Sequence, residues 1–254
     1  MSTQLRMPFE KFFSLCEKHR WSLETDVGWD SIRRDLVSRE ELETLRRAAL
    51  TEGFSPTYAA DLLDLYCADP EMGAFLSIQF YEEYKHFHAL RRYLRLNGVD
   101  ISDEDVTARR STRTKYTSRL VPLVKFGVSE IFTAIFYRNF SRATAEPVLK
   151  RLCQFISADE YRHLSFYMSS LEQHVREEGI AAEEIVRVLE QYQHQGLEAV
   201  EDWVEFWRSN GRRYTGFEPY VVLQETLNRI AGRPLSLRGL VQRTTDRAHA
   251  QTFH

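Results

Sequence analysis

Cysteine is scarce in this 254-residue chain. Its three cysteines, Cys16, Cys67 and Cys153, lie far apart, and no CxxC pair occurs. This excludes a zinc ribbon and a rubredoxin-type iron site, because both need closely paired cysteines. So sparse a set is typical of a reducing compartment. The first residues also lack the apolar core of a signal peptide, so we expect a cytoplasmic protein.

Long hydrophobic runs and an excess of charge of one sign are also missing. We find no apolar run long enough to cross a bilayer, which predicts a protein without a membrane span. The net charge of −3 gives no reason to expect nucleic acid as a partner. A chain of this length can bury a core without disulfides or structural metals. A metal site in it would therefore serve function rather than hold the fold together.

Glycine and proline are few, 11 and 7 residues, and the chain lacks the alternation of polar and apolar residues that strands show. The sequence therefore predicts an all-α protein. Ser38 and Glu41 form a capping-box pattern at one helix start. Asp69 followed by Pro70 marks another. The first predicted helix runs from Ser38 to the low sixties, with a kink at Gly53 and Pro56. The second runs from Pro70 to Leu96, the third over about 117–144 and the fourth from Pro147 to near Gly179. Two more are expected over about 181–209 and near 217–231.

The rest of the chain has weaker patterns. Residues 1–38 are expected to be irregular or short-helical, and residues 98–115 read as a polar connection. The tail after Gly232 has no clear pattern. We expect one domain over residues 1–254, with a core helical bundle at about 40–178.

Two Glu-x-x-His motifs stand out, Glu83–His86 (EYKH) and Glu160–His163 (EYRH). Residues three apart share one face of a helix, so each pair can bind one metal ion. The bulky polar residues between them suit an outward-facing side. One such match is expected by chance from composition alone. A single motif would therefore read as a surface glutamate near a histidine.

Two further glutamates strengthen the metal hypothesis. A paired-metal site in a bundle needs a Glu-x-x-His from each of two helices and one glutamate from each of the other two. Glu52 lies 31 residues before Glu83, and Glu130 lies 30 residues before Glu160. Each interval is long enough for the chain to run down one helix, turn, and return along the next helix to the same level of the bundle. The predicted metal ligands are Glu52, Glu83, His86, Glu130, Glu160 and His163.

The setting of Glu130 supports burial, since apolar residues flank it on both sides in LVPLVKFGVSEIFTAIFY. A buried carboxylate is costly without a partner. That partner is a metal ion or, as the alternative, an arginine. Glu52 lies in a more polar segment, where a solvated acid is the alternative. Oxygen-rich ligands with one histidine per ion suit iron or manganese, and four carboxylates balance two divalent ions.

At these residues the chain resembles the soluble acyl-carrier-protein desaturases of the ferritin-like superfamily. Thr51–Tyr58 (TEGFSPTY) is similar to the family segment TEEALPTY. Glu82–Asp100 (EEYKHFHALRRYLRLNGVD) is similar to the motif that begins EENRHG. Ser157–His163 (SADEYRH) is similar to AADEKRH. The resemblance covers about residues 25–175. It implies a ferritin-like four-helix bundle with additional N- and C-terminal helices, and two iron ions, or manganese with iron.

The resemblance also implies three roles beyond the ligands. Thr133, one turn after Glu130, takes the place of a threonine near bound oxygen. Trp29 and Asp159 take the places of a tryptophan and an aspartate that form a hydrogen-bonded chain with a metal-binding histidine. The alternatives are an ordinary helix threonine for Thr133 and a core anchor for Trp29.

The implied activity is O2-dependent oxidation of an unactivated C–H bond in a fatty-acyl chain, with the chain carried on an acyl carrier protein. Electrons would come from an external donor such as ferredoxin, and a homodimer is expected. The basic segment Arg109–Arg119 could dock the acidic carrier, or be only a solvated face. Two other functions remain open: a di-iron hydroxylase of natural-product biosynthesis, and a ferritin-like protein that handles iron or peroxide.

Overall fold

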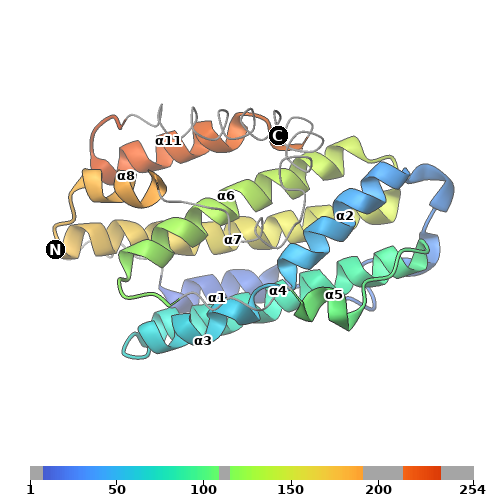
Figure 1. The fold of residues 1–254 in the computed structure, drawn as a ribbon, viewed down its shortest axis with the longest axis horizontal. Coiled ribbons are helices and arrows are strands. Elements are labelled where there is room, and N and C mark those ends of the chain that lie inside the picture. Colours follow the sequence, from blue (N-terminus) through green and yellow to red (C-terminus); the bar gives the residue numbers. More distant parts are fainter. Residues whose placement is uncertain (1–7, 109–114, 191–213, 236–254) are drawn as a thin grey trace.

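The computed structural model describes residues 8–108, 115–190 and 214–235, and these residues form helices, turns and loops without a strand. The predicted all-α class is confirmed. Figure 1 shows long helices running side by side. The bundle is built from α2 (Arg39–Glu52) continued by α3 (Pro56–Leu65), α4 (Pro70–Leu96), α6 (Leu120–Ala143) and α7 (Pro147–Glu177).

The predicted helix starts are confirmed at the level of hydrogen bonds. The Ser38 side chain accepts from the Glu41 backbone N–H while the Glu41 carboxylate accepts from the Ser38 N–H, which is a complete capping box. The Asp69 carboxylate accepts from Met72 N at 3.0 Å, one residue before Pro70 opens α4. These caps satisfy amides that have no partner within the helix.

Two segments differ from the sequence prediction. The expected kink near Gly53 is a full break, because α2 ends at Glu52 and α3 begins only at Pro56. Proline has no N–H and its ring clashes with the preceding turn, so it starts a helix more easily than it continues one. The connection expected at 98–115 contains a short helix, α5 (Asp103–Thr107), which a capping box of Ser102 and Asp105 begins.

Shorter helices flank the bundle. The N-terminal segment forms α1 (Phe9–Lys18), η1 (Trp29–Ser31) and η2 (Arg34–Leu36). At the other end, α8 (Ala182–Glu190) and α11 (Glu218–Ala231) lie along α6, on the side away from α4 (Figure 1). The helix predicted near 217–231 is therefore confirmed. Of the helix predicted over 181–209, the part after residue 190 lies outside the described residues.

Helix α6 corrects one expectation. By length and composition, Leu120–Ala143 is apolar enough to cross a membrane, although the sequence was expected to hold no such run. However, 72% of its most apolar window is buried inside the protein. That burial is typical of the core helix of a soluble bundle, where a helix is apolar all round because other helices surround it.

Two apolar clusters fill the bundle, and polar residues separate them. On α4, Phe75 belongs to the first cluster and Leu90 to the second. On α7, Phe166 belongs to the first and Ile156 to the second. The two Glu-x-x-His motifs lie between these positions on both helices. The sequence therefore places its acidic and imidazole side chains in a layer between two dry packed regions.

Helices α6 and α7 approach closely at Gly127, where an added Cβ would overlap Met168 Cε. We expect Gly127→Ala to lower the free energy of unfolding by about 1 kcal/mol, at the low end of overpacking costs, because the end of the flexible Met168 side chain must move to another rotamer. Gly73→Ala is the matched control, since a Cβ at Gly73 meets nothing within 4 Å. That change should stabilise the helix by about 0.5–1 kcal/mol. Urea unfolding of both variants tests the pair, and equal shifts would contradict the close contact.

Candidate metal centre

The structure brings all six predicted ligand residues together. Two overlapping groups form, and within each group the potential ligand atoms lie within 4.8 Å of one another. Both groups contain Glu83 and Glu160, which makes these two residues the link between the groups. The first group is Glu52, Glu83, His86 and Glu160, and the second is Glu83, Glu130, Glu160 and His163.

Each bundle helix contributes from a defined place. Glu52 is the last residue of α2, and Glu130 lies in the middle of α6. Both side chains are only 4% exposed, so the solvated-acid alternative for Glu52 is wrong. Among the described residues, no arginine pairs with Glu130, whose one ion-pair partner is His163. The arginine alternative for Glu130 is therefore wrong as well.

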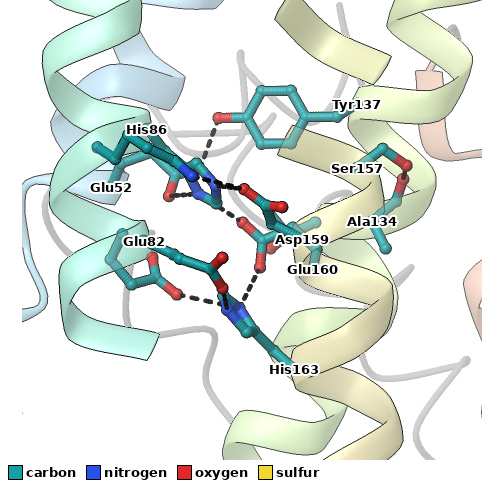
Figure 2. Close-up of polar contacts among 12 residues, drawn as sticks. Glu52, Glu82, His86, Ala134, Tyr137, Ser157, Asp159, Glu160 and His163 are labelled. Atoms are coloured by element: carbon teal, nitrogen blue, oxygen red, sulfur yellow. Dashed lines mark hydrogen bonds and ion pairs between the residues drawn. The ribbon is translucent and has the colours of Figure 1, made fainter. Parts of the chain in front are cut away.

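Figure 2 shows the two imidazole rings lying among the carboxylates. His86 Nδ1 lies 3.1 Å from Glu160 Oε1, and His163 Nδ1 lies 3.2 Å from Glu160 Oε2. The two oxygens of Glu160 thus face different histidines. Metal–ligand bonds of about 2.1 Å at right angles place neighbouring ligand atoms roughly 3.0 Å apart. The observed spacing suits ligands gathered around two ions.

Two buried atoms at this place lack a hydrogen bond. Among the described residues, neither His86 Nδ1 nor Glu160 Oε1 has a hydrogen-bond partner, although they lie 3.1 Å apart. Leaving buried polar atoms unsatisfied is costly, and native proteins rarely do so. A cation between the two atoms would satisfy both lone pairs. The donor set therefore fits a pair of metal ions.

The electrostatics of the buried carboxylates also fit a pair of cations. Burial raises the pKa values of Glu83 and Glu130 well above the usual range, and the charge of Glu160 adds to this. Burial alone would also raise the pKa of Glu160, but interactions with Glu130 and both histidines hold it well below its usual value. The raised pKa values of Glu83 and Glu130 show that their charged forms are costly here without a positive partner.

Carboxylates outside the ligand set hold the far side of each imidazole. His86 Nε2 lies 2.9 Å from Asp159 Oδ2, and His163 Nε2 lies 2.8 Å from Glu82 Oε2. Such partners fix the ring orientation and direct the other nitrogen toward a metal. Glu82 was not predicted as a site residue. The signal was available, because an acid precedes the glutamate in both motifs, EEYKH and DEYRH.

The predicted role of Trp29 is wrong, and Trp21 takes its place. Trp21 Nε1 donates to Asp159 Oδ2 at 2.7 Å, which completes a chain from the indole through Asp159 to His86. Trp29 Nε1 donates instead to the Leu23 carbonyl at 2.5 Å. Trp29 packs in the second apolar cluster, so its alternative as a core anchor holds. The chain turns between the two tryptophans, so only Trp21 lies next to the candidate metal centre.

Lys85 corrects the expectation that residues inside the motifs face outward. It is buried, with Nζ 3.5 Å from Asp159 Oδ2 and 4.2 Å from the centre of the Trp21 ring. Arg162 pairs with the other oxygen of Asp159. Despite burial, His86 and these cations lower the pKa of Asp159 to about 2. The aspartate therefore stays charged as it orients His86.

Thr133 lies one turn after Glu130 on α6 and is half-buried. Its hydroxyl donates to the Ser129 carbonyl at 3.0 Å, as an ordinary helix threonine does. A role near oxygen stays a prediction for this residue.

We expect Trp21→Phe to weaken metal binding by about 10-fold, because the loss of an outer partner loosens Asp159 and with it His86. Trp29→Phe is the matched control, since its indole donates only to a carbonyl away from the ligands. Titration of both variants with Fe(II) under anaerobic conditions measures the difference. Equal affinities in Trp21→Phe and Trp29→Phe would contradict the assignment of the hydrogen-bonded chain.

No protein-family model matches the chain. The chain matches curated relatives from two strains of Mycobacterium tuberculosis. They are named as a putative acyl-[acyl-carrier-protein] desaturase, DesA2, and are 30% identical to this chain over 130 residues. The match covers 48% of this chain and 47% of the relative. The chain thus spans about half the length of the curated relatives it matches.

Among solved structures, the fold is similar to that of an R2-like ligand-binding oxidase, a Gly→Leu variant with a non-activated Mn/Mn cofactor. The TM-score is 0.57, with 13% sequence identity and coverage of 92% of this chain and 95% of that one. The likeness concerns the fold. Sequence and fold together confirm that the chain resembles the acyl-carrier-protein desaturases and is a ferritin-like helical bundle whose buried carboxylates and histidines can bind two metal ions.

Proposed function

We propose that this protein is an O2-dependent di-iron oxidoreductase that oxidises an unactivated C–H bond of a fatty-acyl chain carried on an acyl carrier protein. One observation carries the proposal: both histidines turn Nδ1 toward the shared carboxylate of Glu160. The partial match to a desaturase supports the acyl substrate. In this proposal Glu52, Glu83, His86, Glu130, Glu160 and His163 are the iron ligands.

The two ions, when bound, would supply the activation of O2 and the removal of hydrogen. The side chains of this protein bind, orient and shield. Asp159 and Glu82 orient the two imidazoles. The two apolar clusters exclude water on either side of the ligand layer, which strengthens electrostatic interactions there. The polar layer is thus dry enough for chemistry that bulk water would interrupt.

The proposal includes partners and surroundings. Electrons come from an external donor such as ferredoxin, the protein works in the cytoplasm, and two chains form a homodimer. The acidic carrier docks on the basic segment that precedes α6. Lys115 and Arg119 of that segment are exposed, whereas Arg109, Arg110 and Arg113 lie outside the described residues.

A second candidate is a di-iron oxygenase that hydroxylates a small bound molecule. The name of the structural neighbour, a ligand-binding oxidase, is the basis for considering it. The two candidates share the metal centre and differ in the substrate and in the fate of the oxygen.

The test begins with metal analysis of the purified protein. The iron-loaded protein is then reduced and exposed to O2 with acyl carrier proteins of several chain lengths, and the products are read by mass spectrometry. Loss of two hydrogen atoms supports desaturation, and gain of one oxygen atom supports hydroxylation. Full iron loading with no oxidised product, but with rapid consumption of peroxide, would overturn the proposal in favour of an iron- or peroxide-handling protein.

A further inference from the structure

The glutamate at the end of α2 is held by a buried phenol. Tyr137, on α6, donates its hydroxyl to Glu52 Oε1 at 2.6 Å (Figure 2). The other oxygen, Oε2, faces the site and lies 3.6 Å from His86 Nδ1. The two oxygens of Glu52 therefore have different surroundings: one is held by the protein, and one is open to a metal ion.

The glutamate of α6 shows the same division. Gln79, on α4, donates its amide N–H to Glu130 Oε1 at 2.8 Å. The amide is itself oriented, because Tyr167 donates its hydroxyl to Gln79 Oε1 at 2.6 Å. Glu130 Oε2 lies 3.7 Å from His163 Nδ1. Two different donors thus produce the same arrangement in the two halves of the site.

These donors are fixed in place. Tyr137 and Tyr167 are each 1% exposed and Gln79 is fully buried, so water does not compete for the hydrogen bonds. A hydrogen bond to a carboxylate in such a setting is among the stronger kinds.

We propose that Tyr137 and Gln79 are positioning residues that restrict Glu52 and Glu130 to one metal-facing oxygen each, which keeps a coordination position on each ion free for an external ligand. An oxygen that accepts a short hydrogen bond is a poor second ligand for the same ion. Glu160 lacks such a donor on Oε1, and each of its oxygens faces a histidine. The inference rests on the paired-metal centre of the proposed function and adds control of open positions.

Co(II) is the probe, because its visible absorption weakens as its coordination number rises. We expect Tyr137→Phe to bind two Co(II) ions per chain with a loss of visible absorbance at one of them, since the freed oxygen of Glu52 adds to that ion. Gln79→Met should have the same effect at the ion on the Glu130 side, with a smaller effect at the other ion because the Gln79 amide also contacts Glu83, which both groups share, at 3.4 Å. The shift that azide causes in the wild-type spectrum should be lost in parallel.

Tyr93→Phe is the matched control. Tyr93 is a fully buried tyrosine that donates to the carboxylate of Glu146 at 2.8 Å, in the second apolar cluster and away from the ligands. This variant should keep the wild-type Co(II) spectrum, and thermal unfolding of all variants checks that they fold.

Three outcomes would overturn the inference. The first is a wild-type spectrum in Tyr137→Phe, and the second is an equal change in Tyr93→Phe. The third is complete loss of one ion from Tyr137→Phe, because the phenol would then be needed for binding itself. If the wild-type protein fails to bind two Co(II) ions, the assignment of a paired-metal centre is wrong. If the spectra behave as expected but no acyl chain is oxidised, only the proposed function fails.

Discussion

Glu160→Gln is expected to lose both metal ions, with each affinity falling more than about 100-fold, beyond the effect of removing an outer-shell partner. The reason is that the two oxygens of Glu160 face His86 and His163 separately, so both groups of ligand atoms depend on it. Glu130→Gln should remove mainly the ion on the His163 side. Metal content after gel filtration and calorimetric titration with Fe(II) under anaerobic conditions measure the two variants.

The same pair of variants should differ in stability without metal. The low pKa of Glu160 means that it is the charged partner of both histidines. Breaking such a buried pair costs about 3–5 kcal/mol. The raised pKa of Glu130 favours its neutral form, which glutamine closely resembles, so Glu130→Gln should cost less stability. Urea unfolding in the presence of a chelator tests this contrast. Full binding of two ions by Glu160→Gln would show that the ligand assignment is wrong.

Metal binding should strengthen steeply as pH rises. Burial raises the pKa values of Glu83 and Glu130. Burial alone would lower the pKa values of His86 and His163, but their hydrogen bonds with carboxylates raise them. A raised pKa means that a group binds its proton more tightly, and a metal ion must displace that proton. Affinity should therefore rise by about ten-fold per pH unit for each proton released. Calorimetry in buffers of different ionisation enthalpy counts the protons.

The stability of the metal-free protein should follow the opposite trend. A group whose pKa is raised on folding stabilises the protein at low pH, and this contribution is lost as pH rises through the folded value. For the histidines the loss begins above their ordinary value of 6.5. The gap in melting temperature between the iron-loaded and metal-free proteins should therefore widen with pH. Glu160→Gln is the control and should show little gap. A gap that stays constant from pH 6 to pH 9 would contradict this account.

The sequence predicts the helices well because their start signals are local. Asp69 and Pro70 mark the start of α4 without any knowledge of its neighbours, and Ser38 with Glu41 does the same for α2. The ligand glutamates follow from a regular spacing along the chain. In a bundle of long helices joined by short turns, residues about 30 positions apart return to the same height, so Glu52 and Glu130 meet the two motifs.

The surroundings of the ligands could not be predicted in the same way. Trp21 and Asp159 are 138 positions apart, and no periodicity links a loop before the bundle to its last helix. Tyr137 meets Glu52 only because α2 stops where it does. Lys85 looks like a surface lysine in the sequence, and it is buried because the ring of Trp21 packs against its ammonium group. Such contacts arise from packing between elements rather than from any one segment.

The break after Glu52 has an electrostatic consequence. The C-terminal end of a helix carries about half a negative charge, and α2 ends at Glu52 itself. The carboxylate of Glu52 therefore adds to the negative pole of its own helix, whereas Glu130 lies mid-helix and feels no such pole. The two ligand groups match in composition, but the electrostatic potential at them differs. A cation bound on the Glu52 side would be stabilised by this helix dipole as well as by the side chains, which would make the two metal positions unequal.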